Sequence, residues 1–201
     1  MANDLYELPV LVVNQKVKVI ELTNEYLVRD EQGTSVGAVC EVGQSNLKKF
    51  VRAVSSYDQF FTHRLEVRDA AGTPLLVLTR PRKFVKSRLL VEKPDGTSVG
   101  EIVQNNVFGK IRFQLSADGT TLGSINAENW RAWNFAISDA NGTEIARITK
   151  TWEGFAKTLF TTADDYVLQR HVPITGTLAD LVLAAALCID TALKQDDRGL
   201  N

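Results

Sequence analysis

Apolar and polar residues alternate along most of this chain, in short runs separated by turn-forming residues. Ile111, Phe113 and Leu115 alternate with polar neighbours, and Phe135 and Ile137 follow the same pattern further on. Apolar side chains at every second position predict β-strands that bury one face. Most of the chain therefore has the pattern of an antiparallel β-protein.

The runs are punctuated by a repeated turn signal, an acid or Asn shortly before Gly-Thr. It occurs at Asp30…Gly33-Thr34, Asp69…Gly72-Thr73, Asp95-Gly96-Thr97, Asp118-Gly119-Thr120 and Asn141-Gly142-Thr143. Gly tolerates a positive φ, so Asp-Gly and Asn-Gly between apolar runs predict hairpins. The last four glycines are spaced by 24, 23 and 23 residues, and one further step predicts a sixth turn at residues 162–166. Six hairpins imply about twelve strands.

The alternation stops at residues 178–194, where the pattern predicts a helix. Every residue from Leu181 to Ile189 is apolar, and the segment contains no Gly or Pro. Thr177 followed by Asp180 is a capping-type start. A helix without a polar face is buried in a protein core or in a membrane. Because a membrane span needs about 20 apolar residues, we expect a core helix.

The strands and the helix together predict the architecture. A twelve-stranded sheet tends to curl or close, and closure removes its exposed edges. A barrel of that width needs something to fill it, and the apolar helix needs burial on every side. We predict a mainly β, closed antiparallel barrel of about twelve strands around the helix, as one domain over residues 1–195 with a polar tail at 196–201. The alternative is two six-stranded sheets packed as a sandwich, with the helix at one end.

Composition and charge narrow the function classes. The 201 residues carry a formal net charge of −1, so no global field attracts nucleic acid or membranes. Cys40 and Cys188 have neither metal-binding spacing nor a C-x-x-C arrangement. The start of the sequence lacks the features of a signal peptide. We expect a cytoplasmic protein, peripheral at the inner membrane face if it meets a membrane.

Several segments, taken in order, resemble phospholipid scramblases. They are residues 67–73, 79–83 and 94–102, then Ala146–Phe155, Phe160–Tyr166 and the apolar helix ending in Ile189-Asp190. The resemblance covers about residues 20 to 195 and is strongest to the bacterial scramblase-related group. That group shares its fold with plant LURP-one-related proteins and the tubby C-terminal domain. The resemblance implies a twelve-stranded barrel threaded by a hydrophobic C-terminal helix.

The resemblance also implies a lipid-related function. Eukaryotic scramblases are proposed to move phospholipids between leaflets in response to Ca²⁺, and tubby domains bind phosphoinositide head groups. This chain shows neither the Pro-rich arm nor the palmitoylated cysteine cluster of the eukaryotic proteins. We therefore expect binding of anionic phospholipid head groups rather than scrambling itself. The alternative is a non-catalytic protein-interaction or structural domain with a protein partner and no lipid function.

The candidate lipid site is a basic segment with no acid between Asp69 and Glu92. Lys86 and Arg88 alternate with other residues and are expected on one outward strand face. Clustered cations attract anionic lipid, and arginine forks suit phosphate oxygens. A charged strand that protects a sheet edge has the same composition. The basic segment comprises Arg80, Arg82, Lys83, Lys86 and Arg88.

A second candidate is a calcium site at Asp164 and Asp165, in the segment aligned with the proposed Ca²⁺ loop of scramblases. Oxygen ligands at alternating positions suit Ca²⁺. Thr162 stands where the family usually has Asp, and neither a Gly at the sixth loop position nor a Glu at the twelfth is present. An ordinary turn with Asx hydrogen bonds explains the cluster as well. No other cofactor is expected.

Catalysis and nucleic-acid binding find no support in the sequence. There are two histidines, no G-x-S-x-G, no H-E-x-x-H, no phosphate-binding loop and no dinucleotide fingerprint. There is also no second basic stripe that would follow a nucleic acid. We expect a protein that binds its target without catalysis.

Overall fold

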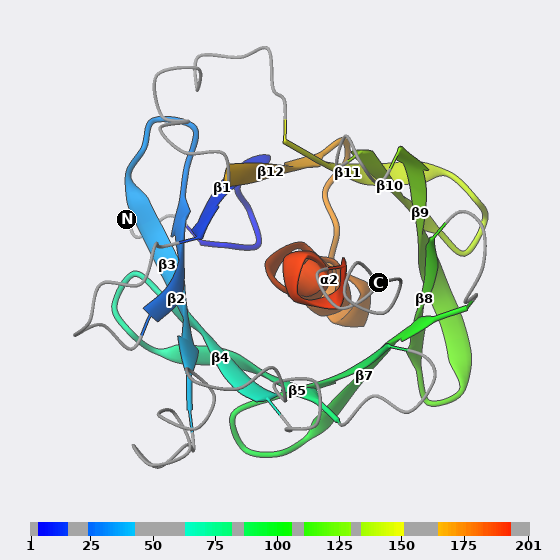
Figure 1. The fold of residues 1–201 in the computed structure, drawn as a ribbon, viewed down its shortest axis with the longest axis horizontal. Coiled ribbons are helices and arrows are strands. Elements are labelled where there is room, and N and C mark those ends of the chain that lie inside the picture. Colours follow the sequence, from blue (N-terminus) through cyan, green and yellow to red (C-terminus); the bar gives the residue numbers. More distant parts are fainter. Residues whose placement is uncertain are drawn as a thin grey trace, which may run out of the picture.

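Twelve strands form one closed antiparallel barrel, and helix α2 runs through its centre (Figure 1). This computed structural model describes residues 4–15, 24–42, 63–81, 87–105, 111–129, 134–150 and 165–193. Each strand pairs with its neighbours in sequence, and β1 pairs with β12 through Val10↔Gln169 to Asn14↔Asp165. The elements are β1 Val10–Gln15, β2 Asn24–Arg29, β3 Ser35–Glu41, β4 His63–Asp69, β5 Pro74–Arg80, β6 Arg88–Glu92, β7 Ser98–Gln104, β8 Arg112–Ala117, β9 Thr120–Asn129, β10 Asn134–Asp139, β11 Glu144–Thr149, β12 Asp165–Arg170 and α2 Gly176–Leu193.

The predicted barrel around a core helix is confirmed, and the sandwich alternative is wrong. A sandwich would leave β1 and β12 as sheet edges, whereas their pairing closes the sheet on itself. Closure pairs the backbone groups of both strands and leaves no open edge.

The Gly-Thr signals form tight hairpins, as predicted. In the β10–β11 turn, Gly142 N–H donates to the Asp139 carbonyl at 3.1 Å and Asp139 N–H donates to the Thr143 carbonyl at 2.9 Å. Gly142 has φ of 84°, which is strained for any residue with a Cβ. The turns before Thr34, Thr73 and Thr97 repeat both hydrogen bonds. This is the pattern of a short hairpin loop whose glycine forms a bulge.

The sixth predicted turn is not centred on Asp165, and residues 162–164 of that prediction lie outside the described residues. Asp165 does not lie in a turn but opens β12, where it pairs with Asn14. The 23-residue period fails because the connection between β11 and β12 is longer than the β5–β6, β7–β8 and β9–β10 connections that separate the periodic turns. The next turn follows β12, at residues 171–175, where the chain leaves the barrel wall and enters α2.

Antiparallel neighbours place alternate turns at alternate ends of the barrel. All five Gly-Thr hairpins share one end, which we call the hairpin end. The segment before β1 and the start of α2 belong to the same end. The remaining connections, including the one between β5 and β6, leave the strands at the opposite end, which we call the connection end.

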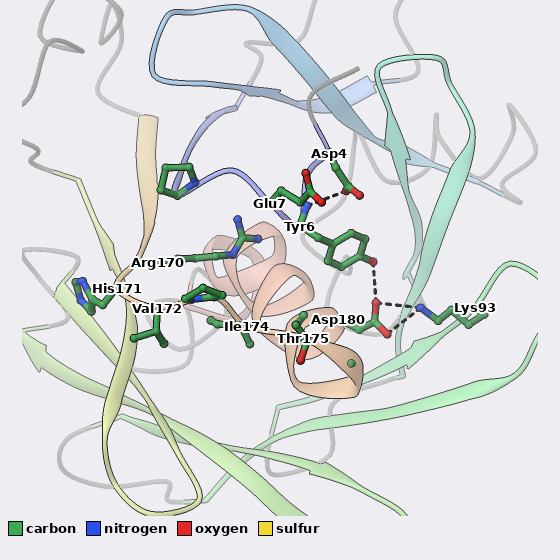
Figure 2. Close-up of a pocket in the computed structure, with 14 residues that line it drawn as sticks. Asp4, Tyr6, Glu7, Lys93, Arg170, His171, Val172, Ile174, Thr175 and Asp180 are labelled. Carbon is green, nitrogen blue, oxygen red and sulfur yellow. Dashed lines mark hydrogen bonds and ion pairs between the residues drawn. The ribbon is translucent and has the colours of Figure 1, made fainter. Parts of the chain in front are cut away.

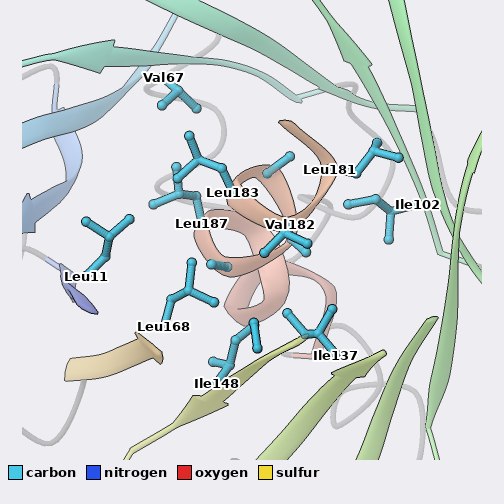
Figure 3. Packing of buried hydrophobic residues seen from close by; sticks show 14 of the residues in the cluster. Leu11, Val67, Ile102, Ile137, Ile148, Leu168, Leu181, Val182, Leu183 and Leu187 are labelled. Carbon is cyan, nitrogen blue, oxygen red and sulfur yellow. The ribbon is translucent and has the colours of Figure 1, made fainter. Parts of the chain in front are cut away.

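Helix α2 is buried on every side, as its composition predicts. Leu181 to Leu187 are all at most 3% exposed. Figure 3 shows Leu181 beside Ile102 on one side of the helix, with Leu187 and Leu11 on the opposite side. The helix lies against β7, with β5, β6 and β8 beside it. No helix in the described part of the chain is both long and apolar enough to cross a membrane.

The start of α2 differs from the prediction in two respects. The helix begins at Gly176, two residues before the predicted start at residue 178, and its described part ends at Leu193. Asp180 does not complete a capping pair. Its carboxylate instead accepts hydrogen bonds from the Tyr6 hydroxyl at 2.7 Å and from the Lys93 ammonium at 2.8 and 3.0 Å. Asp180 thus ties the helix to the segment before β1 and to the β6–β7 turn.

Replacing Ala185 with Asp should prevent folding. Ala185 is 3% exposed within the barrel core, so the new carboxylate would be buried without a partner. The penalty is several kcal/mol, a large part of a total stability of about 5–15 kcal/mol. Circular dichroism and size-exclusion chromatography measure the outcome. The matched control is Ala71→Asp in an exposed turn, which should fold normally. A folded, monodisperse Ala185→Asp protein would contradict the central position of the helix.

Replacing Tyr6 with Phe should remove a stabilisation that depends on pH. Burial of the hydroxyl and its hydrogen bond to Asp180 raise the pKa of Tyr6 above its ordinary 10.0. Tyr6 therefore stays protonated in the folded protein but ionises in the unfolded chain above pH 10, so its contribution declines as the pH rises. Below pH 10 we expect Tyr6→Phe to lose about 1 kcal/mol of unfolding free energy. Urea unfolding at pH 8.5 and 10.8 should show this deficit shrinking; an unchanged deficit would contradict the assignment.

Candidate functional site

A pocket of about 740 Å³ opens at the hairpin end, where the chain passes from the barrel wall into the core helix. Three parts of the chain form it: the segment before β1, the link between β12 and α2, and the β6–β7 turn (Figure 2). The pocket exists because the helix enters the barrel here and its first turn does not fill the opening. Its lining residues are Asp4, Tyr6, Glu7, Pro9, Lys93, Arg170, His171, Val172, Pro173, Ile174, Thr175, Gly176, Ala179 and Asp180.

Arg170 is the buried cation of this pocket. It is the last residue of β12 and is 8% exposed. One guanidinium nitrogen, Nη1, donates to the Leu8 carbonyl, and the Arg170 backbone N–H donates to the Pro9 carbonyl at 2.7 Å. The other nitrogen, Nη2, is buried and has no hydrogen-bond partner in the described structure. Burial lowers the pKa of Arg170, while Tyr6 and Asp4 act in the opposite direction.

An unpaired buried donor is unusual, because leaving such a group unsatisfied costs about 1–3 kcal/mol and more when it is charged. Figure 2 shows the Arg170 side chain reaching from β12 across the start of α2 towards the segment before β1. The neighbouring His171 does not supply a second free cation, because its Nε2 lies 3.0 Å from Glu144 Oε1. Arg170 therefore has a buried donor in this pocket with capacity for an additional acceptor.

The carboxylates of the pocket occupy two different environments. Asp180 is buried and neutralised by Lys93, whose ammonium lies 2.8 Å away. Asp4 and Glu7 are exposed on the segment before β1. Asp4 also accepts a hydrogen bond from the Tyr6 backbone N–H at 3.0 Å. The pocket thus has a buried cation inside and exposed negative charge on one rim.

Sequence reasoning missed this pocket, although the turn repeat carries a signal for it. Four of the Gly-Thr turns share the two backbone hydrogen bonds described above. Three of these four begin with Asp, whose carboxylate accepts from the Thr backbone N–H at 2.8 or 2.9 Å. The β6–β7 turn begins with Lys93 instead. There the hydrogen bond to Thr97 N–H comes from Asp95, at 2.9 Å. Lys93 is free to bind Asp180, so the break in the repeat marks the pocket.

The structure places only part of the basic segment. Arg80 ends β5 and Arg88 begins β6, whereas Arg82, Lys83 and Lys86 lie outside the described residues. Because β6 begins at Arg88, the predicted strand face shared by Lys86 and Arg88 does not appear in the described part. Arg88 Nε lies 2.6 Å from Glu101 Oε2 on β7. The other end of the connection is fixed by Ser87, whose N–H donates to Gln104 Oε1 at 3.2 Å.

The calcium candidate is not tested by the structure. Asp164 lies outside the described residues, and Asp165 is described only as the first residue of β12. Among the described residues, no group of three or more His, Cys, Asp or Glu side chains is placed to hold a metal.

Solved structures and characterised sequences resemble this chain over most of its length. An X-ray structure of a protein from Arabidopsis thaliana matches with a TM-score of 0.53, covering 92% of this chain and 94% of that one at 12% identity. This likeness concerns the fold alone. A phospholipid scramblase family protein from Schizosaccharomyces pombe is 25% identical over 177 residues, which are 80% of this chain and 45% of the relative.

Altered inheritance rate of mitochondria protein 25 from Saccharomyces cerevisiae is 24% identical over 204 aligned positions, covering 84% of this chain and 60% of that protein. The chain therefore spans about half of the length of these curated relatives. The sequence model of the Scramblase family matches residues 2–193. This match covers the barrel and the core helix, and the chain belongs to the Scramblase family.

Proposed function

We propose that this protein binds anionic phospholipid head groups at a membrane surface, with the basic segment as the contact and without catalysis. The observation that carries the proposal is a difference in sequence charge between the hairpins of one barrel end and the segments that join the strands at the other, in a member of the Scramblase family. Lipid scrambling is not part of the proposal. The membrane face concerned is the cytoplasmic one, where anionic lipids are concentrated.

The hairpin end is mainly acidic. Its tight turns and their first residues contain one lysine, Lys93, which is bound to Asp180. The acids in the same turns are Asp30, Glu31, Asp69, Asp95, Asp118 and Asp139.

The sequences that join the strands at the connection end are mainly basic. The acids in them are Glu21, Asp58, Glu153 and Asp164. The cations in them are Lys16, Lys18, Lys48, Lys49, Arg52, Arg82, Lys83, Lys86, Lys110, Arg131, Lys150 and Lys157.

This separation supports a particular orientation. With a formal net charge of −1, the protein as a whole is not attracted to an anionic surface. A local cluster contributes about 1 kcal/mol for each cation near the surface, and this attraction decays within a Debye length. The protein would approach with the connection end towards the membrane and the acidic hairpin end away from it. Within the basic segment, Arg88 would contribute less than the others, because Glu101 already neutralises it.

Vesicle co-sedimentation tests the proposal. The protein should bind vesicles that contain phosphatidylserine and not vesicles of phosphatidylcholine alone, and binding should weaken steeply between 50 and 500 mM salt. Runs with and without Ca²⁺ test Asp164 and Asp165 as a calcium site. Absence of binding to anionic vesicles at low salt would reject the proposal and favour the alternative of a protein partner.

Charge reversal at one position of the basic segment locates the contact. Lys86→Glu should weaken binding to anionic vesicles by roughly thirtyfold, because it replaces about 1 kcal/mol of attraction with similar repulsion. The matched control is Arg29→Glu, an equal change in net charge on the last residue of β2, at the hairpin end. Equal losses in the two variants would show a dependence on net charge alone and would contradict the assigned contact.

A further inference from the structure

The pocket at the hairpin end lies at the opposite end of the barrel from the basic segment and contains its own unmet donor. Arg170 is more than nine-tenths buried, lines the pocket and leaves Nη2 without a partner in the described structure. The first turn of α2 also lines the pocket, and the first backbone N–H groups of a helix have no partner within it. Both features favour an oxygen acceptor that carries negative charge.

The rim of the same pocket favours the opposite charge. Glu7 and Asp4 are exposed there, and Glu7 makes no side-chain hydrogen bond in the described structure. A simple anion would be attracted by Arg170 but repelled by these two carboxylates. A simple cation would be repelled by Arg170. A ligand that carries both charges, with the anion innermost, fits the arrangement.

The lining residues and the volume of the pocket indicate the polarity and the size of this ligand. Pro9, Val172, Pro173 and Ile174 give the pocket a mainly apolar side. Val172 is 45% exposed. Among the described residues, it is the large hydrophobic side chain that is exposed to solvent. A volume of about 740 Å³ is in the range of small-ligand pockets and exceeds what one inorganic ion needs.

We propose that this pocket binds an amine-bearing phosphate ester, either as a free molecule or as the head group of a zwitterionic phospholipid. The phosphate oxygens accept from Arg170 Nη2 and from the backbone at the start of α2, and the ammonium group lies towards Glu7 and Asp4. Nη2 is closed to solvent in this structure, so binding includes a small rotation of the guanidinium towards the pocket. This inference is independent of the proposed function, because it concerns other residues, the other barrel end and a ligand whose ammonium group offsets part or all of its phosphate charge.

Isothermal titration calorimetry with the whole chain tests the proposal, using O-phosphoethanolamine as the probe. Inorganic phosphate and ethanolamine are the comparison ligands, each carrying one of the two charges. O-phosphoethanolamine should bind saturably and at least about tenfold more tightly than either comparison ligand. The proposal would be overturned if O-phosphoethanolamine did not bind and the phosphatidylethanolamine vesicles described below did not bind either. Equal binding of inorganic phosphate would overturn the zwitterionic assignment.

Two variants separate the two charges of the ligand. Arg170→Lys keeps a cation but removes the paired N–H donors of the guanidinium. It should weaken O-phosphoethanolamine binding at least about tenfold. Glu7→Gln should weaken O-phosphoethanolamine binding about threefold while leaving inorganic phosphate binding equal or tighter. Because Arg170 also binds the Leu8 carbonyl, its variant could lose stability, and a thermal melt checks this. Glu7 is exposed, so its opposite effects on the two probes test the proposal even if Arg170→Lys unfolds.

The control is Glu31→Gln, an exposed carboxylate in the β2–β3 turn of the same barrel end, which should change neither affinity. An unchanged affinity in both Arg170→Lys and Glu7→Gln would overturn the assigned contacts.

Vesicles distinguish the two sources of the ligand. If the ligand is a lipid head group, vesicles of phosphatidylcholine with phosphatidylethanolamine should bind the protein where phosphatidylcholine alone does not, and Glu7→Gln should reduce this binding. If it is a free molecule, the soluble probe should bind and these vesicles should not. Arg170→Lys and Glu7→Gln should keep the salt-sensitive binding to phosphatidylserine vesicles, and Lys86→Glu should keep the affinity for O-phosphoethanolamine. Either proposal can therefore fail without the other.

Discussion

The structure depends on burying a helix that has no polar face. Leu181 to Leu187 are excluded from solvent around the full circumference of α2, which a single flat sheet could not achieve. An eight-stranded barrel is already filled by its own side chains. Twelve strands leave room for a helix, and closure of β1 on β12 surrounds it with strands on all sides. The width of the barrel and the composition of the helix therefore require each other.

The same constraint explains why buried polar groups are needed where the helix enters the barrel. A buried helix must still satisfy its first backbone N–H groups and must be fixed against sliding along the barrel axis. Apolar contacts are not directional, so the position along the axis is set by hydrogen bonds. Asp180 accepts them, from Lys93 in the β6–β7 turn and from Tyr6 on the segment before β1. Arg170 holds that segment in place through the Leu8 carbonyl. The pocket is the space that these anchoring groups leave open.

The antiparallel topology gives the two barrel ends different chemistry. Tight turns need Asp, Asn and Gly for their hydrogen bonds and positive φ, so the hairpin end becomes acidic for structural reasons. The connection end is not restricted in this way, and its sequences can carry the cations that a membrane contact requires. The two proposals therefore assign different ligands to the two ends of one barrel, an anionic surface to the connection end and a small ligand to the pocket with the buried arginine.

The sequence by itself determined the strands, the hairpins and the core helix, because these follow from local periodicity, turn chemistry and an apolar run. It misplaced the turn near Asp165, because a constant period does not account for one longer connection. It assigned Asp180 to a helix cap, because the alternative partners, Tyr6 and Lys93, are distant along the chain. Only the tertiary structure decided which residues meet at the helix entrance. Arg170, Asp180 and Glu7 come from three separate segments, and only closure of the barrel brings them to one pocket.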